Sequence, residues 1–168
     1  MIAAFKAAHI AALAVWCAGL ILLPVLMHLH GRGEPVRAQA GYARFRRLSH
    51  FSYTHVVTPA AVIAVAAGTV LIVMLELVDA WLLAKLVAVA GMVLVHAWLG
   101  HLVVQSGEGL GGYRMPPPLI ALALGVPLML VILWLVLAKP DLTPLIERMP
   151  MFLREPQDRE LPPDLVPI

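Results

Sequence analysis

The sequence predicts an all-α membrane protein built as a bundle of four transmembrane helices. Of its 168 residues, 61% are hydrophobic and 13% are charged, whereas soluble domains are about 45–50% apolar and about 25% charged. The mean hydropathy of +0.90 indicates the same class. Four apolar segments each reach the roughly 20 residues that a spanning helix needs; they are residues 3–29, 53–77, 80–104 and 118–138. We therefore expect one four-helix transmembrane domain over residues 1–140.

The first segment resembles a signal peptide, but two features favour a retained helix. It stays apolar from Ile2 to Met27, well past the roughly 7–15 apolar residues of a signal peptide. Trp16, directly before Cys17, is too large for the small residue that a cleavage site requires. The single cysteine also excludes an internal disulfide or a thiolate cluster.

The connecting and terminal segments differ in composition from the helices. Residues 107–118 contain four glycines and three consecutive prolines, which predict a flexible turn and then a rigid start to the fourth helix. Residues 141–168 are rich in proline and have balanced charges, so we expect a proline-rich extramembrane tail that is extended or disordered. An ordered tail would imply a partner, either another membrane subunit or a second copy of the chain.

The distribution of arginine predicts the topology. Five arginines lie between the first and second segments against one acid, Glu34, while the turn between the second and third segments carries only Glu76 and Asp79. The positive-inside rule then places the first loop in the cytoplasm and both termini outside it, in the periplasm of a bacterium. The arginines are Arg32, Arg37, Arg44, Arg46 and Arg47. Without a recognition motif they do not indicate nucleic-acid binding.

Ionisable side chains inside the apolar segments mark the candidate site, because such groups are costly in hydrocarbon. Lys6 and His9 lie in the first segment, and Lys85 and His96 lie in the third. With both termini outside, His9 and Lys85 lie roughly 8–10 Å below the outer boundary at about 1.5 Å per residue. Trp16 follows His9 on the same helical face. Lys85 and His96 are about three turns apart, so one stripe of the third helix should face the interior.

Structural explanations remain open at several of these positions. Lys6 would equally serve as an anchor whose ammonium reaches the outer interface. A second group of histidines collects near the inner boundary and comprises His28, His30, His50, His55 and His101. His101 would equally bond a neighbouring helix or act as a ligand, whereas contact with water or lipid phosphate is the simplest role for His28, His30 and His50. His96 is the one histidine besides His9 that lies too deep for that role, so we expect it to be a reserve ligand.

Haem is one cofactor that suits this chemistry. Imidazole binds haem iron axially, and helix bundles build cofactor sites from facing side chains. A porphyrin slot also needs small residues, although these would equally allow close helix contact; they are Ala11, Ala12, Ala14, Ala18, Gly19, Ala64, Ala66, Ala67 and Gly68. Copper is an alternative, since Met and His bind Cu(I) and Met27 adjoins His28, with Met149 and Met151 in the tail.

The order of polar residues resembles the HemJ-type protoporphyrinogen oxidases and the related CopD-like four-helix membrane proteins. The matching residues are Lys6-Ala-Ala-His9, Trp16 to Leu20 and Leu29-His30 in the first helix, Tyr53 and Thr58-Pro59 in the second, Trp81 to Leu86 with His96 and Gly100 in the third, and Val131 to Pro140 in the last. The resemblance implies a b-type haem bound by His9 and Lys85.

Four positions depart from the family pattern, in which charged or polar residues are usual. This chain has Val25, Phe51, His101 and the pair Leu124-Gly125 there. We therefore expect a haem-b protein of electron transfer, or an accessory subunit of a larger membrane complex such as a respiratory one, in the bacterial inner membrane. The alternatives are a protoporphyrinogen oxidase and a copper-handling or cofactor-free structural subunit.

Overall fold

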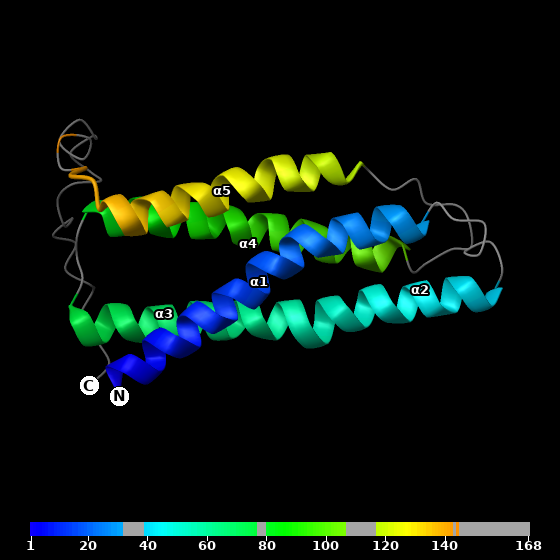
Figure 1. Cartoon of the computed structure of the whole chain (residues 1–168), viewed down its shortest axis with the longest axis horizontal. Coiled ribbons are helices and arrows are strands. Elements are labelled where there is room, and N and C mark those ends of the chain that lie inside the picture. The colour runs from blue at the N-terminus through cyan, green and yellow to red at the C-terminus, as the bar shows by residue number, and fades with distance from the viewer. Residues whose placement is uncertain (32–38, 77–79, 107–116, 143, 145–168) are drawn as a thin grey trace, which may run out of the picture.

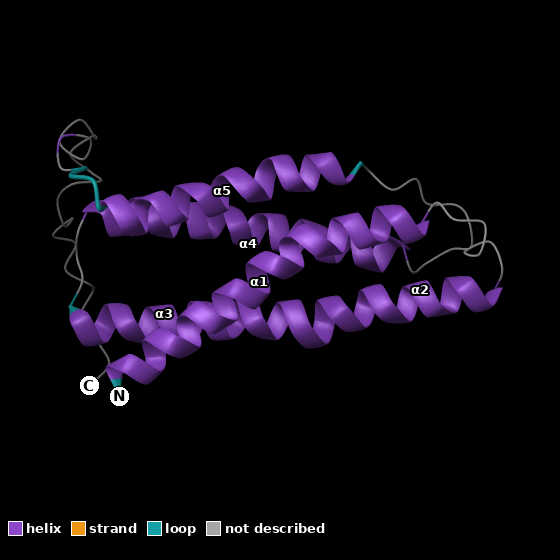
Figure 2. Ribbon diagram, viewed as in Figure 1, coloured by secondary structure: helices purple, strands orange, loops and turns teal. Residues whose placement is uncertain are grey.

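The computed structural model describes residues 1–31, 39–76, 80–106, 117–142 and 144. This part of the chain is helical and contains no strand (Figures 1 and 2). Its elements are α1 (Ile2–Gly31), α2 (Gln39–Phe51), the π-helical segment η2 (Ser52–Val57), α3 (Thr58–Leu75), α4 (Ala80–Ser106) and α5 (Pro118–Ala138). The predicted glycine- and proline-rich loop falls almost wholly outside the described residues, and so does the proline-rich tail from residue 145 onward.

Four helical spans in the described residues are long and apolar enough to cross a membrane, which confirms the predicted all-helical architecture with four spans of membrane-crossing length. They are Ile2–Leu29, Ala43–Leu75, Ala80–Gln105 and Pro118–Ala138. Their outward surfaces carry large apolar side chains such as Leu22, Val87 and Leu94, which are 64%, 72% and 72% exposed. These side chains would be costly in water and suit contact with lipid.

The second span differs from the sequence-based expectation because helix continues well before residue 53. Residues 39–51 were expected to belong to a loop, yet they form α2, which runs without a break through η2 into α3 (Figure 1). Phe45 and Ser49, four residues apart, are buried on one face of α2, whereas Arg44, Arg46 and Arg47 are exposed. Polar residues end an apolar segment but not a helix, because an amphipathic helix needs only one apolar face.

The length of this second helix carries α2 beyond the hydrocarbon. The span Ala43–Leu75 has 33 residues, which extend about 50 Å at about 1.5 Å per residue, while the hydrocarbon core is roughly 30 Å thick. The arginine-rich start of α2 therefore lies at or beyond one membrane boundary.

The π-helical segment has an identifiable cause in Pro59. Proline has no backbone N–H, and its ring would collide with the carbonyl four residues earlier in an α-helix, here that of His55. Thr58 N–H instead bonds the carbonyl of Tyr53, five residues earlier. Residues five apart in an α-helix point roughly 140° apart, whereas the wider turn brings Tyr53 and Thr58 toward one face.

Helix α1 crosses the bundle diagonally and defines its core. Its N-terminal half lies along α3, and its C-terminal half lies beside α4 and α5 (Figure 1). Its contact with η2 is close because a Cβ at Gly19 would collide with the Val57 side chain. The start of α1, the end of α3, the start of α4 and the end of α5 all lie at one end of the bundle, and α2 projects from the other (Figure 1).

Candidate functional site

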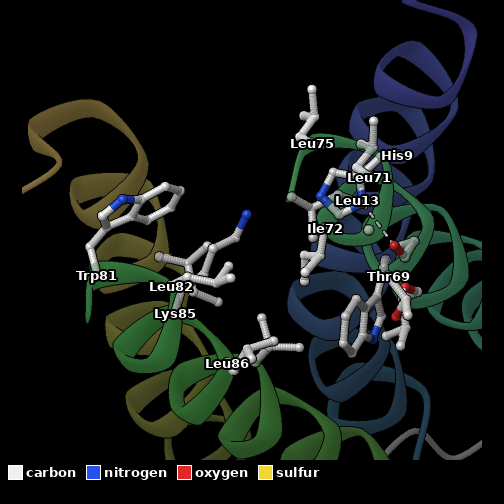
Figure 3. Close-up of a pocket in the computed structure, with 16 residues that line it drawn as sticks. His9, Leu13, Thr69, Leu71, Ile72, Leu75, Trp81, Leu82, Lys85 and Leu86 are labelled. Carbon is white, nitrogen blue, oxygen red and sulfur yellow. Dashed lines mark hydrogen bonds between the residues drawn. The ribbon is translucent and has the colours of Figure 1, made fainter. Parts of the chain in front are cut away.

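A half-open cavity of about 190 Å³ lies between α1 and α3 on one side and α4 on the other, near the end of the bundle where α1 starts (Figure 3). The residues of its lining that are exposed belong to α3 and α4: Val65, Thr69, Leu75 and Leu86. The cavity therefore opens between these two helices. The diagonal course of α1 explains the cavity, because α1 lies against α3 at this level and leaves α4 apart from it.

His9 of α1 forms one wall of the cavity in a fixed orientation. Its Nδ1 lies 2.7 Å from the carbonyl oxygen of Ala64, and Figure 3 marks this bond with a dashed line. A carbonyl oxygen only accepts hydrogen bonds, so Nδ1 carries the proton and donates it. Nε2 of the neutral imidazole then keeps its lone pair. A hydrogen bond from one ring nitrogen to a carbonyl is the arrangement that orients metal-binding histidines.

Gly68 provides the space for this imidazole. A Cβ at position 68 would lie 3.0 Å from His9 Cε1 and 3.2 Å from Nδ1, which is tighter than ordinary van der Waals contact. The small residues of this part of α3 thus have two separate functions. Ala64 supplies a hydrogen-bond acceptor from its backbone, and Gly68 lets the ring approach the helix.

Lys85 extends into the same cavity from the opposite wall. It is half-buried on α4, and its ammonium group points across the cavity toward α1 (Figure 3). No acidic residue lines the cavity in the part of the chain that the structure describes. The structure thus places the nitrogen-bearing side chains of His9 and Lys85 on opposite walls of one apolar cavity.

Trp16 lies where the cavity adjoins the core of the bundle. It is 1% exposed and lines the cavity, and its ring meets that of His96 edge-on at a centroid distance of 6.1 Å and an interplanar angle of 82°. His96, also buried, contacts Trp16 but does not line the cavity. A reserve-ligand role for His96 would therefore need Trp16 to move.

His96 instead belongs to a polar cluster with η2 that the sequence did not reveal. Its ring stacks on Tyr53 at 4.9 Å and 21°, and its Nε2 lies 3.3 Å from Thr58 Oγ1. The Tyr53 hydroxyl donates to the His96 carbonyl at 3.3 Å, and Gly100 leaves space for the Tyr53 ring. Pro59 was the signal available in the sequence, because it displaces the helix into the turn that presents Tyr53 and Thr58 together.

The remaining candidate residues lie outside the cavity lining. Lys6 is exposed one turn before His9, as an anchor at the membrane boundary would be. His50, His55 and His101 are exposed, and His28 is half-buried near the opposite end of α1. The side chain of His30, like Met149 and Met151 of the tail, lies outside the described residues.

The donor set limits which metal centres the described residues can form. Among them, no group of three or more His, Cys, Asp or Glu side chains could hold a metal ion. One imidazole and one amine are too few to hold a bare metal ion, because such an ion usually has four ligands, three or four of them from side chains. They suit a metal that brings its other ligands with it, as iron in a porphyrin does.

No protein-family model, curated protein or solved structure matches this chain.

Proposed function

We propose that this chain is a haem-b-binding membrane protein that serves in electron transfer or as an accessory subunit of a larger membrane complex. The observation that carries the proposal is the His9 imidazole, whose Nδ1 donates to the Ala64 carbonyl at 2.7 Å beside a cavity that Lys85 lines from the other wall. The tautomer leaves Nε2 as the metal-binding atom, as in the axial histidines of haem proteins.

The apolar lining supports a hydrophobic macrocycle. The cavity holds about 190 Å³, less than the roughly 300–1,000 Å³ of typical small-molecule sites. A tetrapyrrole therefore fits only if a large part of the macrocycle occupies the opening between α3 and α4. Haem bound there would supply one-electron redox chemistry.

Two roles are open to Lys85 in this proposal. A neutral amine has a lone pair and would bind the iron, whereas an ammonium group would pair with a haem propionate. Because no acid lines the cavity in the described residues, a propionate would meet no competing carboxylate there. Trp16, which is 1% exposed, lines the cavity on the side of the core.

The topology that goes with this proposal follows from the exposed arginines of α2. The positive-inside rule assigns that end of the bundle to the cytoplasm, and the cavity then lies toward the periplasmic side of a bacterial inner membrane. Electron exchange with a partner would accordingly take place near the periplasmic face.

The proposal is tested by the reduced-minus-oxidised absorption spectrum of the full-length protein purified in mild detergent, together with its haem content per chain. We expect Soret and α bands of a b-type haem in the unmodified protein. His9→Ala and Lys85→Ala should lower the haem content or shift the bands. His101→Ala, which replaces an exposed histidine of α4, should leave both unchanged.

Two results would reject the proposal. One is the absence of haem from protein purified from haem-replete cells and from protein incubated with added haemin. The other is equal haem content in the unmodified protein and in both cavity variants, since the iron would then be bound by other residues.

A further inference from the structure

A groove separate from the cavity at His9 and Lys85 runs along the outside of α1 and η2. It has a volume of about 570 Å³ and is lined almost wholly by apolar side chains, with Ser52 the one residue of the lining that has a polar side chain. On α1 it extends from Val15 to Leu29, about 20 Å at about 1.5 Å per residue. This length covers the depth of one leaflet, which is half of the roughly 30 Å hydrocarbon core.

The groove leads toward the arginines of α2 along one row of side chains. Val56 and Ser52 line the groove, and Leu48 and Arg44 continue the same row at spacings of four residues, which keeps them on one face of the helix. Leu48 is 44% exposed, and the Arg44 side chain is also exposed. Arg46 points away from this row, since two residues turn an α-helix by roughly 200°.

The charge at this end of the bundle is not balanced by acids in the described residues. Their two acidic side chains are Glu76, which caps α3, and Asp141, which follows α5, and both helix ends lie opposite α2 (Figure 1). The exposed Arg44 guanidinium thus stands at the polar end of an apolar groove, where a basic group attracts anionic partners.

We propose that this groove binds an anionic phospholipid, with an acyl chain along α1 and the headgroup phosphate at Arg44. Guanidinium groups pair readily with phosphate, and basic residues at a membrane boundary attract anionic lipid. A second copy of the chain fits the groove less well. Membrane insertion gives every copy the same orientation, so its own α2 arginines would meet those of the first copy, and like charges repel.

The test compares spin-labelled phosphatidylglycerol with phosphatidylcholine carrying the same acyl chains, using the full-length protein in vesicles and measuring each lipid's association by electron spin resonance. We expect the unmodified protein to prefer phosphatidylglycerol by about fivefold, the factor for about one arginine at an anionic surface. Arg44→Gln should abolish this preference, and Arg46→Gln, the matched control, should keep it. Ala18→Phe, which fills the groove from α1, should weaken the association of both lipids.

Three results would overturn the assignment. Equal loss of preference in Arg44→Gln and Arg46→Gln would show general surface electrostatics instead of a site. Unchanged lipid association in Ala18→Phe, with the helix content and melting temperature of the unmodified protein, would show that the groove does not hold the chain. A change from dimer to monomer in Ala18→Phe, measured by light scattering with correction for detergent, would show that a second copy occupies the groove.

Discussion

The His9 imidazole rests directly against Gly68, where a Cβ would lie 3.0 Å from its Cε1 atom. A glycine on α3 thereby sets the orientation of a histidine on α1, and the ring completes the contact by donating to the Ala64 carbonyl one turn earlier on α3. The candidate ligand and the helix that holds it are thus fitted to each other, and this fit can be tested without changing the histidine.

Gly68→Ala is expected to separate haem binding from folding. The added methyl group displaces the imidazole and weakens its bond to Ala64, which should lower haem affinity roughly tenfold or more, as loss of a supporting contact does at other metal sites. Alanine is also a better helix former than glycine by about 1 kcal/mol, so the melting temperature of the haem-free protein should not fall. Haem titration and thermal unfolding measure the two effects.

Gly125→Ala is the control for this variant. A Cβ there would meet its nearest neighbours, Met129 and Val95, at 3.9 Å, an ordinary contact. It should leave haem affinity unchanged. Similar haem affinities for the two variants would show that close contact at Gly68 does not orient His9.

Substitution of Lys85 by arginine should distinguish the two roles proposed for this residue. Arginine remains charged and offers no lone pair to a metal, but it pairs well with carboxylates. If Lys85 pairs with a propionate, Lys85→Arg should keep the haem and its spectrum while Lys85→Leu, which offers neither a charge nor a lone pair, loses haem. If Lys85 is an axial ligand, both variants should change the spectrum in the same way. Haem content and spectrum equal to those of the unmodified protein in both variants would contradict either role.

Thr58→Val should weaken the contact between the start of α3 and α4 without affecting the cavity. It removes the hydroxyl that lies 3.3 Å from His96 Nε2, and such bonds in membrane proteins contribute about 0.6 kcal/mol on average. We expect the free energy of unfolding in mixed detergent to fall by about this amount, with haem content unchanged. Thr54→Val, at an exposed threonine of η2 whose hydroxyl lies 3.5 Å from His50 Nδ1 and which does not line the cavity, is the matched control. A loss of haem in Thr58→Val alone would instead connect the cluster to the cofactor.

Gly19→Ala should destabilise the bundle through overpacking against Val57. A Cβ at position 19 collides with that side chain, and overpacking of a tight contact costs about 1–3 kcal/mol. Shortening the partner in Gly19→Ala/Val57→Ala should recover stability relative to the sum of the two single variants, which a double-mutant cycle of unfolding free energies measures. Additive losses would show that the two residues do not press on each other.

The amino-acid sequence by itself determined that this chain forms helices fit to span a membrane. Apolar runs of spanning length, interrupted by short polar segments, predict four such spans, and the structure confirms them. It also singled out Lys6, His9, Lys85 and His96, since ionisable side chains at this depth are costly without a partner or a function; of these, His9 and Lys85 line the cavity and Lys6 and His96 do not. It did not reveal the length of the second helix, because polarity marks where apolar surface stops and not where backbone hydrogen bonding stops.

Only the tertiary structure decided which of these side chains meet. Residue spacing gives the depth of a side chain along its helix but not the direction in which the helix turns it, because that rotation depends on contacts with the neighbouring helices. The diagonal course of α1 places His9 against α3 and opposite Lys85. The π-helical turn before Pro59 presents Tyr53 and Thr58 to His96 and keeps that histidine outside the cavity lining.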